Sequence, residues 1–254
     1  MQPLRRVQDI GIVEAGVDAA YHVARHPRGR PVIDQLAARQ ADDALAELQR
    51  LGAKAAFRHA DVSKHGEVRA WVDHTIAEFG VPTVLINNAG IAVEKLAVEQ
   101  TEADWDAVIG ANLKGAYFAA TEMARRMAER QQGGNIINIG MAGLEGIRAN
   151  EYGADYYVSK TGMLVMTRAL AAAYATRNIR VNMVSPGQLD NSVDLPPPDE
   201  IGQTVPLGRA GGLVKIGSSV IGSLRLPSPW RRGAPDRGAR SRERALALPF
   251  RAES

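Results

Sequence analysis

The stretch PTVLINNAG, residues 82–90, decides the fold class of this chain. Residues 84–86 form a short continuous apolar run, which is typical of a strand buried in a parallel sheet. Two asparagines and a glycine follow directly and end the strand as a turn. Ligands of open parallel sheets bind at the carboxyl ends of the strands, so this turn is a candidate edge of a binding site.

Helix and strand patterns alternate around this stretch, over residues 37–185. Strands separated by helices of this length predict a Rossmann-like α/β fold, a doubly wound parallel sheet in a single domain with helices on both faces. We expect helices at 37–52, 64–80, 101–134 and 156–178, with Thr101 as an N-cap, and strands at 54–62, 82–90, 135–140 and 179–187.

The composition excludes several classes of protein. A chain of 254 residues suits one α/β domain, and the absence of cysteine excludes disulfides and thiolate metal sites. The five histidines show no metal-ligand spacing, so no metal is expected. No apolar run reaches the roughly 18 residues that cross a bilayer. These features predict a cytoplasmic protein without a membrane partner.

The net charge of +3 is concentrated in the last part of the chain. From residue 225 onward, eight arginines stand against three carboxylates, among many prolines, glycines and alanines. This composition favours disorder. Few aromatic residues are interleaved with the arginines, so a nucleic-acid partner is not expected. We therefore expect a domain over residues 1–214, of which 1–36 are atypical, and an Arg/Pro-rich tail over 215–254 that is disordered or misread.

The segment YYVSK, residues 156–160, places Tyr156 and Lys160 on one face of an expected helix. A tyrosine has a pKa of about 10, and a nearby ammonium lowers it. A phenol tuned in this way can give a proton to a carbonyl oxygen or take one from an alcohol. The hydride would have to come from a cofactor, because no side chain supplies one. The alternative is a chance pair at the start of a helix.

Four further segments have the same order and spacing as a known family. They are DV at 61–62, NNAG at 87–90, ANLKGAYF at 111–118 and VNMVSPG at 181–187. With YYVSK they resemble the short-chain dehydrogenase/reductase family, most closely the 3-oxoacyl-carrier-protein reductase type, which VPLGRAGG at 205–212 also fits. The resemblance covers residues 37–214. It implies an oxidoreductase that transfers hydride between a nicotinamide cofactor and a small carbonyl or alcohol substrate.

The resemblance also implies catalytic roles. Tyr156 would be the acid/base, and Lys160 would lower its pKa and bind the nicotinamide ribose. Asn112 would interrupt the backbone ladder of its helix and hold a relay water. Tyr152 and Tyr157 are rivals by proximity, but only Tyr156 has the family's distance to Lys160.

The implied cofactor is NADP, with NAD as the alternative. Asp61 and Val62 would contact the adenine, and Arg39 would bind the 2′-phosphate unless it is a plain helix-start arginine. The remaining contacts would come from Asn88, Ala89, Gly90, Pro186 and Gly187. Family members form homo-oligomers through helices such as 101–130 and 156–177, so a dimer or tetramer is expected.

Three features depart from the family pattern. Met141 stands where a serine should follow the strand NIINIG, and residues 1–36 contain neither the glycine-rich phosphate-binding turn nor a convincing strand before it. After Lys215 the family pattern stops. Our hypothesis is that the ends derive from a misread frame and that a dropped codon explains Met141. The alternative is a degenerate, non-catalytic relative that acts as a binding or scaffold protein.

Overall fold

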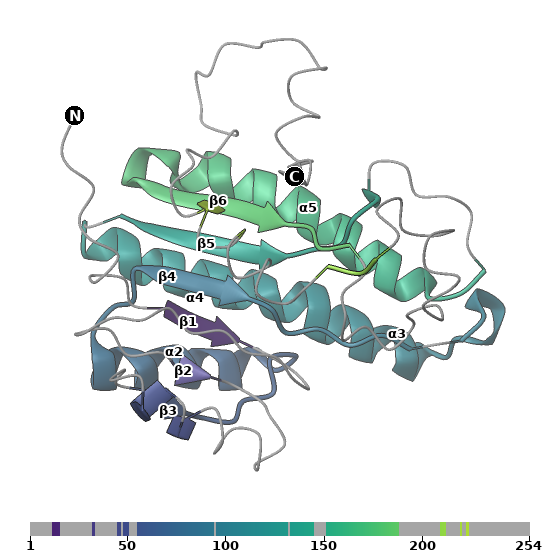
Figure 1. The fold of residues 1–254 in the computed structure, drawn as a ribbon, viewed down its shortest axis with the longest axis horizontal. Helices are drawn as coiled ribbons and strands as arrows, with labels where there is room; N and C mark the ends of the chain where they lie inside the picture. Colours follow the sequence, from purple (N-terminus) through teal and green to yellow (C-terminus); the bar gives the residue numbers. More distant parts are fainter. Residues whose placement is uncertain are drawn as a thin grey trace, which may run out of the picture.

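The computed structural model describes residues 12–15, 32–33, 45–46, 48–50, 55–93, 95–131, 133–144, 151–187, 209–211, 219 and 222–223. Within them, one six-stranded sheet has the order β3-β2-β1-β4-β5-β6 (Figure 1). Every strand pair is parallel. This is the strand order of the Rossmann fold, so the expected α/β architecture is confirmed.

The middle of the sheet is built from the strand that opened the sequence analysis. β4 (Val84–Asn87) lies between β1 (Ile12–Ala15) and β5 (Gly134–Ile139), and all of its residues are buried. β6 (Ile179–Val184) pairs with β5 along its whole length. Because these strands run parallel, the segments that follow β4, β5 and β6 all start from one edge of the sheet.

Two strands lie in the region where the sequence analysis found no convincing strand. β1 and β2 (Val32–Ile33) both belong to residues 1–36, so that expectation was wrong. β1 is short and carries only two β-branched residues, which is too little to produce a recognisable pattern. It pairs with β2 on one side and β4 on the other, and this tertiary pairing outweighs its weak local preference. β3 (Ala56–Phe57) is shorter than the expected 54–62.

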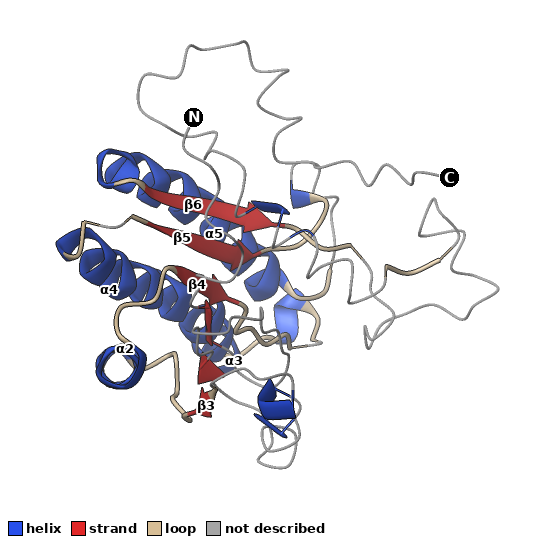
Figure 2. Ribbon diagram, turned by 60° about the vertical axis from the view of Figure 1, so that its left-hand side comes forward, coloured by secondary structure: helices blue, strands red, loops and turns tan. Residues whose placement is uncertain are grey.

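Three long helices line one face of the sheet (Figure 2): α2 (His65–Phe79), α4 (Ala116–Glu129) and α5 (Ala154–Tyr174). Each belongs to a crossover that moves the chain in the same direction along the sheet. Parallel crossovers are right-handed almost without exception, so these helices share a face. The helix expected at 37–52 is described as helical at 45–46 and 48–50. None of the described helices is long and apolar enough to cross a membrane.

α4 approaches the sheet closely because its inner side carries small residues. Met123 and Met127 fill the remaining gaps in one core cluster, which continues into α2 through Trp71, 1% exposed. The alanines on this inner side recur at helical spacing and are all buried: Ala116, Ala119, Ala120 and Ala124. A larger side chain at these positions would push the helix away from the strands.

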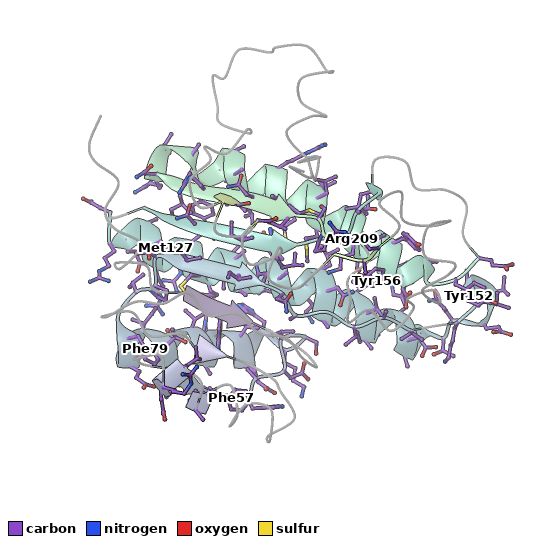
Figure 3. The ribbon with its side chains drawn as sticks, in the orientation of Figure 1. Phe57, Phe79, Met127, Tyr152, Tyr156 and Arg209 are labelled. Atoms are coloured by element: carbon purple, nitrogen blue, oxygen red, sulfur yellow. The ribbon has the colours of Figure 1, made fainter. Side chains whose placement is uncertain are left out.

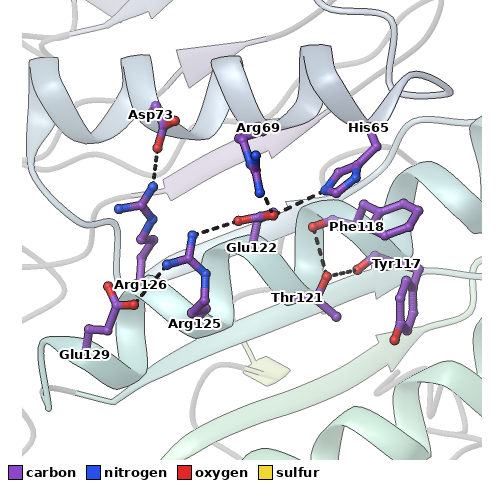
Figure 4. A network of polar contacts seen from close by, with 10 residues as sticks. All are labelled: His65, Arg69, Asp73, Tyr117, Phe118, Thr121, Glu122, Arg125, Arg126 and Glu129. Atoms are coloured by element: carbon purple, nitrogen blue, oxygen red, sulfur yellow. Dashed lines mark hydrogen bonds and ion pairs between the residues drawn. The ribbon is translucent and has the colours of Figure 1, made fainter.

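Charged side chains join α2 and α4 on the outside of this layer (Figure 4). Glu122 accepts a hydrogen bond from the Arg125 guanidinium at 2.9 Å, and this contact lowers the pKa of Glu122. The contacts that cross between the two helices are His65–Glu122, Arg69–Glu122 and Asp73–Arg126. The two helices therefore meet through an apolar inner layer and a charged outer one.

A buried chain of polar side chains crosses the sheet beneath the strand ends. Asn87 Nδ2 donates to Asn138 Oδ1 at 2.8 Å and to the Ala116 carbonyl at 3.2 Å. Asn138 Nδ2 in turn donates to Thr167 Oγ1 at 2.8 Å. The three side chains are at most 2% exposed. The chain joins β4, β5, α4 and α5, and the sequence patterns gave no sign of it.

Removing the middle member of this chain should destabilise the protein. Asn138→Ala takes away the acceptor of Asn87 and the donor to Thr167, leaving polar groups buried with fewer partners. Each such group costs roughly 1–3 kcal/mol. We expect the free energy of unfolding to fall by about 3 kcal/mol, measured by urea denaturation.

Asn182→Ala is the matched control for this substitution. Asn182 lies on the neighbouring strand β6, and its Nδ2 is buried with no hydrogen-bond partner. Its loss should therefore cost less than about 1 kcal/mol. Equal losses for the two variants would contradict the role assigned to Asn138.

Candidate active site

A π-helical turn interrupts the long helix expected over 101–134. α3 (Glu102–Ile109) is followed by η3 (Gly110–Gly115), which has π-helical geometry, and then by α4. Thr101 caps α3 with a reciprocal capping box to Asp104, so the expected N-cap is confirmed. π-turns are rare and occur frequently at functional sites. This one carries Asn112, the residue that the sequence analysis placed in the site.

The side-chain amide of Asn112 joins three segments of the chain. Its Oδ1 accepts from the Ile91 backbone N–H at 2.8 Å, and its Nδ2 donates to the Ile91 carbonyl at 2.9 Å. Nδ2 also donates to Ser159 Oγ of α5 at 3.1 Å. The residue is fully buried. Asn112 therefore fixes the loop after β4 against α5 with its amide, at a place where the π-turn interrupts the α-helical ladder. Its role in holding a relay water stays a prediction.

Lys160 is a buried ammonium group at the same place. It is 4% exposed, and its Nζ donates to the Ile139 carbonyl, the last residue of β5, at 2.8 Å. Burial lowers the pKa of Lys160 to about 8, because the charged form loses its hydration. At neutral pH the group is still mostly protonated, so it can act on a neighbouring phenol.

Tyr156 lies next to this ammonium. Lys160 Nζ is 5.6 Å from the centre of the Tyr156 ring, as expected for residues one helical turn apart. Tyr157 packs edge-on against Tyr156 with ring centres 6.3 Å apart. Tyr152 lies farther from the strand ends (Figure 3) and is 50% exposed. Of the three tyrosines, Tyr156 is the one that the structure places over Lys160.

Gly90 brings the backbone of the loop after β4 close to these groups. A Cβ atom at Gly90 would lie 3.3 Å from Asn112 Oδ1 and 3.5 Å from Lys160 Nζ. A side chain here would fill the space that borders both polar groups. An ammonium and an amide that no side chain of residue 90 covers suit a ligand with hydroxyl groups, such as the ribose of a nicotinamide cofactor. These residues therefore fit the implied cofactor.

The segment after β5 is held against the segment after β6. The Gly140 N–H donates to the Val184 carbonyl, and the Ala142 N–H donates to the Pro186 carbonyl, both at 2.8 Å. A Cβ at Gly140 would meet the end of the Met183 side chain, so a larger residue here would require that flexible side chain to move. Met141 lies between these two anchored residues, at the position where a serine was expected.

Asp61 and Val62 lie on another side of the π-turn. Val62 is buried, and a Cβ at Gly115 would come within 2.8 Å of the Val62 carbonyl oxygen. The Asp61 carboxylate accepts from the Ser63 hydroxyl at 2.6 Å and contacts the Lys64 ammonium at 3.0 Å. These contacts, the Ser63 hydrogen bond first, lower the pKa of Asp61. A role of this pair at the adenine stays a prediction.

The structure thus gathers most of the predicted residues and adds one. Gly90, Asn112, Tyr156 and Lys160 lie together, Ala89 is buried beside them in the chain, and Pro186 and Gly187 follow β6 at the same edge. Asn88 follows β4, and Arg39 lies outside the described residues. Ser159 was missed, although it is fully buried and links Asn112 to the Tyr156 carbonyl. Its place inside YYVSK was the only available signal.

The chain is similar in sequence to several known proteins. A family model described as Enoyl-(Acyl carrier protein) reductase matches residues 20–221. A 3-oxoacyl-[acyl-carrier-protein] reductase from Thermotoga maritima is 33% identical over 184 residues, which are 71% of this chain and 74% of that protein. The 2-dehydro-3-deoxy-D-gluconate 5-dehydrogenase of Escherichia coli is 33% identical over 177 residues, which are 66% of this chain and 68% of that protein.

A solved structure supports the fold. A crystal structure described as a short-chain alcohol dehydrogenase from Sinorhizobium meliloti matches with a TM-score of 0.73 and 24% identity, covering 85% of this chain and 92% of that one. The two curated relatives named above are a reductase and a dehydrogenase. They favour an enzyme over the non-catalytic alternative. The chain belongs to the short-chain dehydrogenase/reductase family, whose members are oxidoreductases that transfer hydride between a nicotinamide cofactor and a carbonyl or alcohol.

Proposed function

We propose that this chain reduces a carbonyl substrate with NADPH and that Tyr156 protonates the carbonyl oxygen. The observation that carries the proposal is the buried Lys160 ammonium, 5.6 Å from the Tyr156 ring and next to Gly90, which has no side chain to cover it. The similarity to 3-oxoacyl-[acyl-carrier-protein] reductases makes 3-oxoacyl thioesters the first substrate class to test. NADH is the alternative cofactor.

Tyr156, Lys160 and Asn112 have separate roles in the proposed reaction. The bound nicotinamide cofactor supplies the hydride. Tyr156 donates the proton, because the positive charge of Lys160 stabilises the phenolate that remains. Lys160 is held for this role by the Ile139 carbonyl. Asn112 holds Ile91 and Ser159, and thereby the loop after β4 and the helix that carries Tyr156.

Cofactor contacts are proposed along the strand ends. Asn88, Ala89 and Gly90 would line the cofactor after β4, and Pro186 and Gly187 would lie beside the nicotinamide after β6. Lys160 would bind the ribose, and Asp61 with Val62 would contact the adenine. The segment after β1, where the family pattern places the phosphate-binding turn that this sequence lacks, is outside the described residues.

A homo-oligomer is proposed as the working form. α4 and α5 present exposed apolar side chains on their outer sides, namely Tyr117, Val158 and Val165, which are 44%, 47% and 61% exposed. Such residues on neighbouring helices suit a contact with a second copy of the chain. The mass of the chain in solution is the direct test. Its location in the cytoplasm and the disorder or misreading of 215–254 stay predictions.

The activity itself is tested by NADPH oxidation with 3-oxoacyl thioesters and simple ketones. Tyr156→Phe keeps the ring but removes the proton donor, so kcat should fall about 10²–10⁴-fold. Tyr157→Phe, which removes the neighbouring hydroxyl, is the control and should stay within about threefold of the original kcat. A chain that binds NADPH but turns over no carbonyl would favour the non-catalytic alternative.

Lys160 predicts a pH dependence of stability that needs no substrate. Its pKa is lowered on folding from 10.5 to about 8, so between these values the unfolded chain binds the proton more strongly. The free energy of unfolding should therefore rise with pH above 8, by about 1.4 kcal/mol per unit from this group. Lys160→Met lacks the titrating group. Both chains are denatured at neutral pH and near pH 10. Between these two pH values, the free energy of unfolding of the original chain should rise by about 2 kcal/mol relative to that of Lys160→Met.

A substitution at Met141 is expected to raise the kcat, whereas Tyr156→Phe lowers it. A hydroxyl donor at this position would bind the substrate carbonyl, and a donor of this kind is worth about 10²–10³ in rate. Met141→Ser should therefore raise kcat about 100-fold. Met141→Ala removes the thioether without adding a hydroxyl and is the matched control. Similar kinetics for the serine and alanine variants would show that the missing hydroxyl does not limit the rate.

A further inference from the structure

Two loops that flank the candidate site are bonded to each other just before α5. Leu96 and Tyr152 form an antiparallel bridge. On either side of it, the Ala97 N–H donates to the Glu151 carbonyl at 2.7 Å, and the Gly153 N–H donates to the Lys95 carbonyl at 3.2 Å. We call these paired residues, 95–97 and 151–153, the loop clamp. It joins the loop after β4 to the first turn of the helix that carries Tyr156.

An ion pair ties the loop clamp to α3. Lys95 Nζ donates to Asp104 Oδ2 at 2.7 Å. The same oxygen accepts from the Thr101 N–H at 2.9 Å and from the Thr101 hydroxyl at 2.7 Å. The hydrogen bond from Lys95 is the largest cause that lowers the pKa of Asp104 to about 2, so the carboxylate stays charged at all ordinary pH values. The capping box that starts α3 is therefore also the anchor of the loop clamp.

The other end of the loop clamp reaches Tyr156 within one helical turn. Gly153 is the N-cap of α5 and has φ 63°, a left-handed conformation that favours glycine. Its carbonyl accepts from the Tyr157 N–H at 3.1 Å, and a Cβ on Gly153 would lie 3.9 Å from the Tyr156 Cβ. The position of Gly153 therefore decides where α5 begins and how its first turn presents Tyr156. α3 and α5 also pack against each other (Figure 1).

We propose that Lys95 and Asp104 are positioning residues for Tyr156, acting through Gly153 and the loop clamp. This inference rests on the proposed function, because it assigns a role to the phenol of Tyr156. The proposed influence runs through the backbone. Their ion pair fixes the Lys95 backbone, the backbone fixes Gly153, and Gly153 fixes the start of α5. Small errors in the placement of a catalytic group are costly, and a shift of about 1 Å can reduce rates 10²-fold.

The test combines steady-state kinetics with hydrogen exchange on the full chain. Lys95→Met keeps the length of the side chain but removes its charge, and Lys95→Arg restores a cation. Asp104→Asn keeps an oxygen that can still cap α3 but weakens the ion pair. Arg126→Met is the control, since it breaks the comparable ion pair between α2 and α4 outside the site. NADPH with a 3-oxoacyl thioester is the assay, and exchange is read at the amides of Ala97, Gly153 and Tyr157.

Lys95→Met and Asp104→Asn should lower kcat about 10-fold with the KM for NADPH nearly unchanged, and the three amides should exchange faster. Lys95→Arg should recover most of the kcat, and Arg126→Met should leave both the kcat and these amides unaffected. If Lys95→Met changes neither the kcat nor the exchange of the three amides, the inference is overturned.

Exchange separates this inference from the proposed function. If the unmodified chain turns over no carbonyl, the proposed function fails, but exchange still decides whether the ion pair orders the start of α5. Unchanged exchange at Gly153 and Tyr157 in Lys95→Met would then overturn the inference. Faster exchange confined to the loop clamp and the first turn of α5 would support it.

Discussion

The side-chain amide of Asn112 is the constraint on which the site depends. It bonds both backbone groups of Ile91 and the hydroxyl of Ser159, so a single side chain holds the loop after β4, the π-turn and α5 in register. Without these partners the buried amide would have unsatisfied polar groups. Such groups lower the free energy of unfolding, because their lost hydration is not replaced. The π-turn that carries this amide lies between α3 and α4.

Burial gives Lys160 its chemical character. The core cluster around α4 and α5 removes water from the ammonium, and the Ile139 carbonyl replaces part of the lost hydration. A cation in such a place acts strongly on its surroundings, because little solvent screens it. The polar chain through Asn87, Asn138 and Thr167 lies beneath the same strand ends and keeps β4 and β5 aligned with α5. The buried contacts that stabilise the fold and those that hold Lys160 therefore lie close to the same strand ends.

At Met141 the backbone of the site is held in place, although the expected serine hydroxyl is absent. The backbone around it keeps its hydrogen bonds to the segment after β6, through Gly140 and Ala142. The fold thus presents this position at the strand ends, whichever side chain it carries. The hydroxyl expected by resemblance is absent from the sequence, while the tyrosine, the lysine and the asparagine are present and gathered. The backbone and three of the expected side chains are therefore in place, and one expected hydrogen-bond donor is missing.

The sequence by itself predicted the α/β class and helices over 64–80, 101–134 and 156–178, because apolar periodicity is a local property, and α2, α3, α4 and α5 lie at these places. The roles of Tyr156, Lys160 and Asn112 came from motifs shared with a known family and stay predictions. The sequence could not determine β1 and β2, because strands of four and two residues are stabilised by their neighbours rather than by their own composition. Ser159, the loop clamp and the buried asparagine chain were likewise decided by the tertiary structure. Their partners are distant in sequence, and only the folded sheet brings those hydrogen-bonding groups within reach of one another.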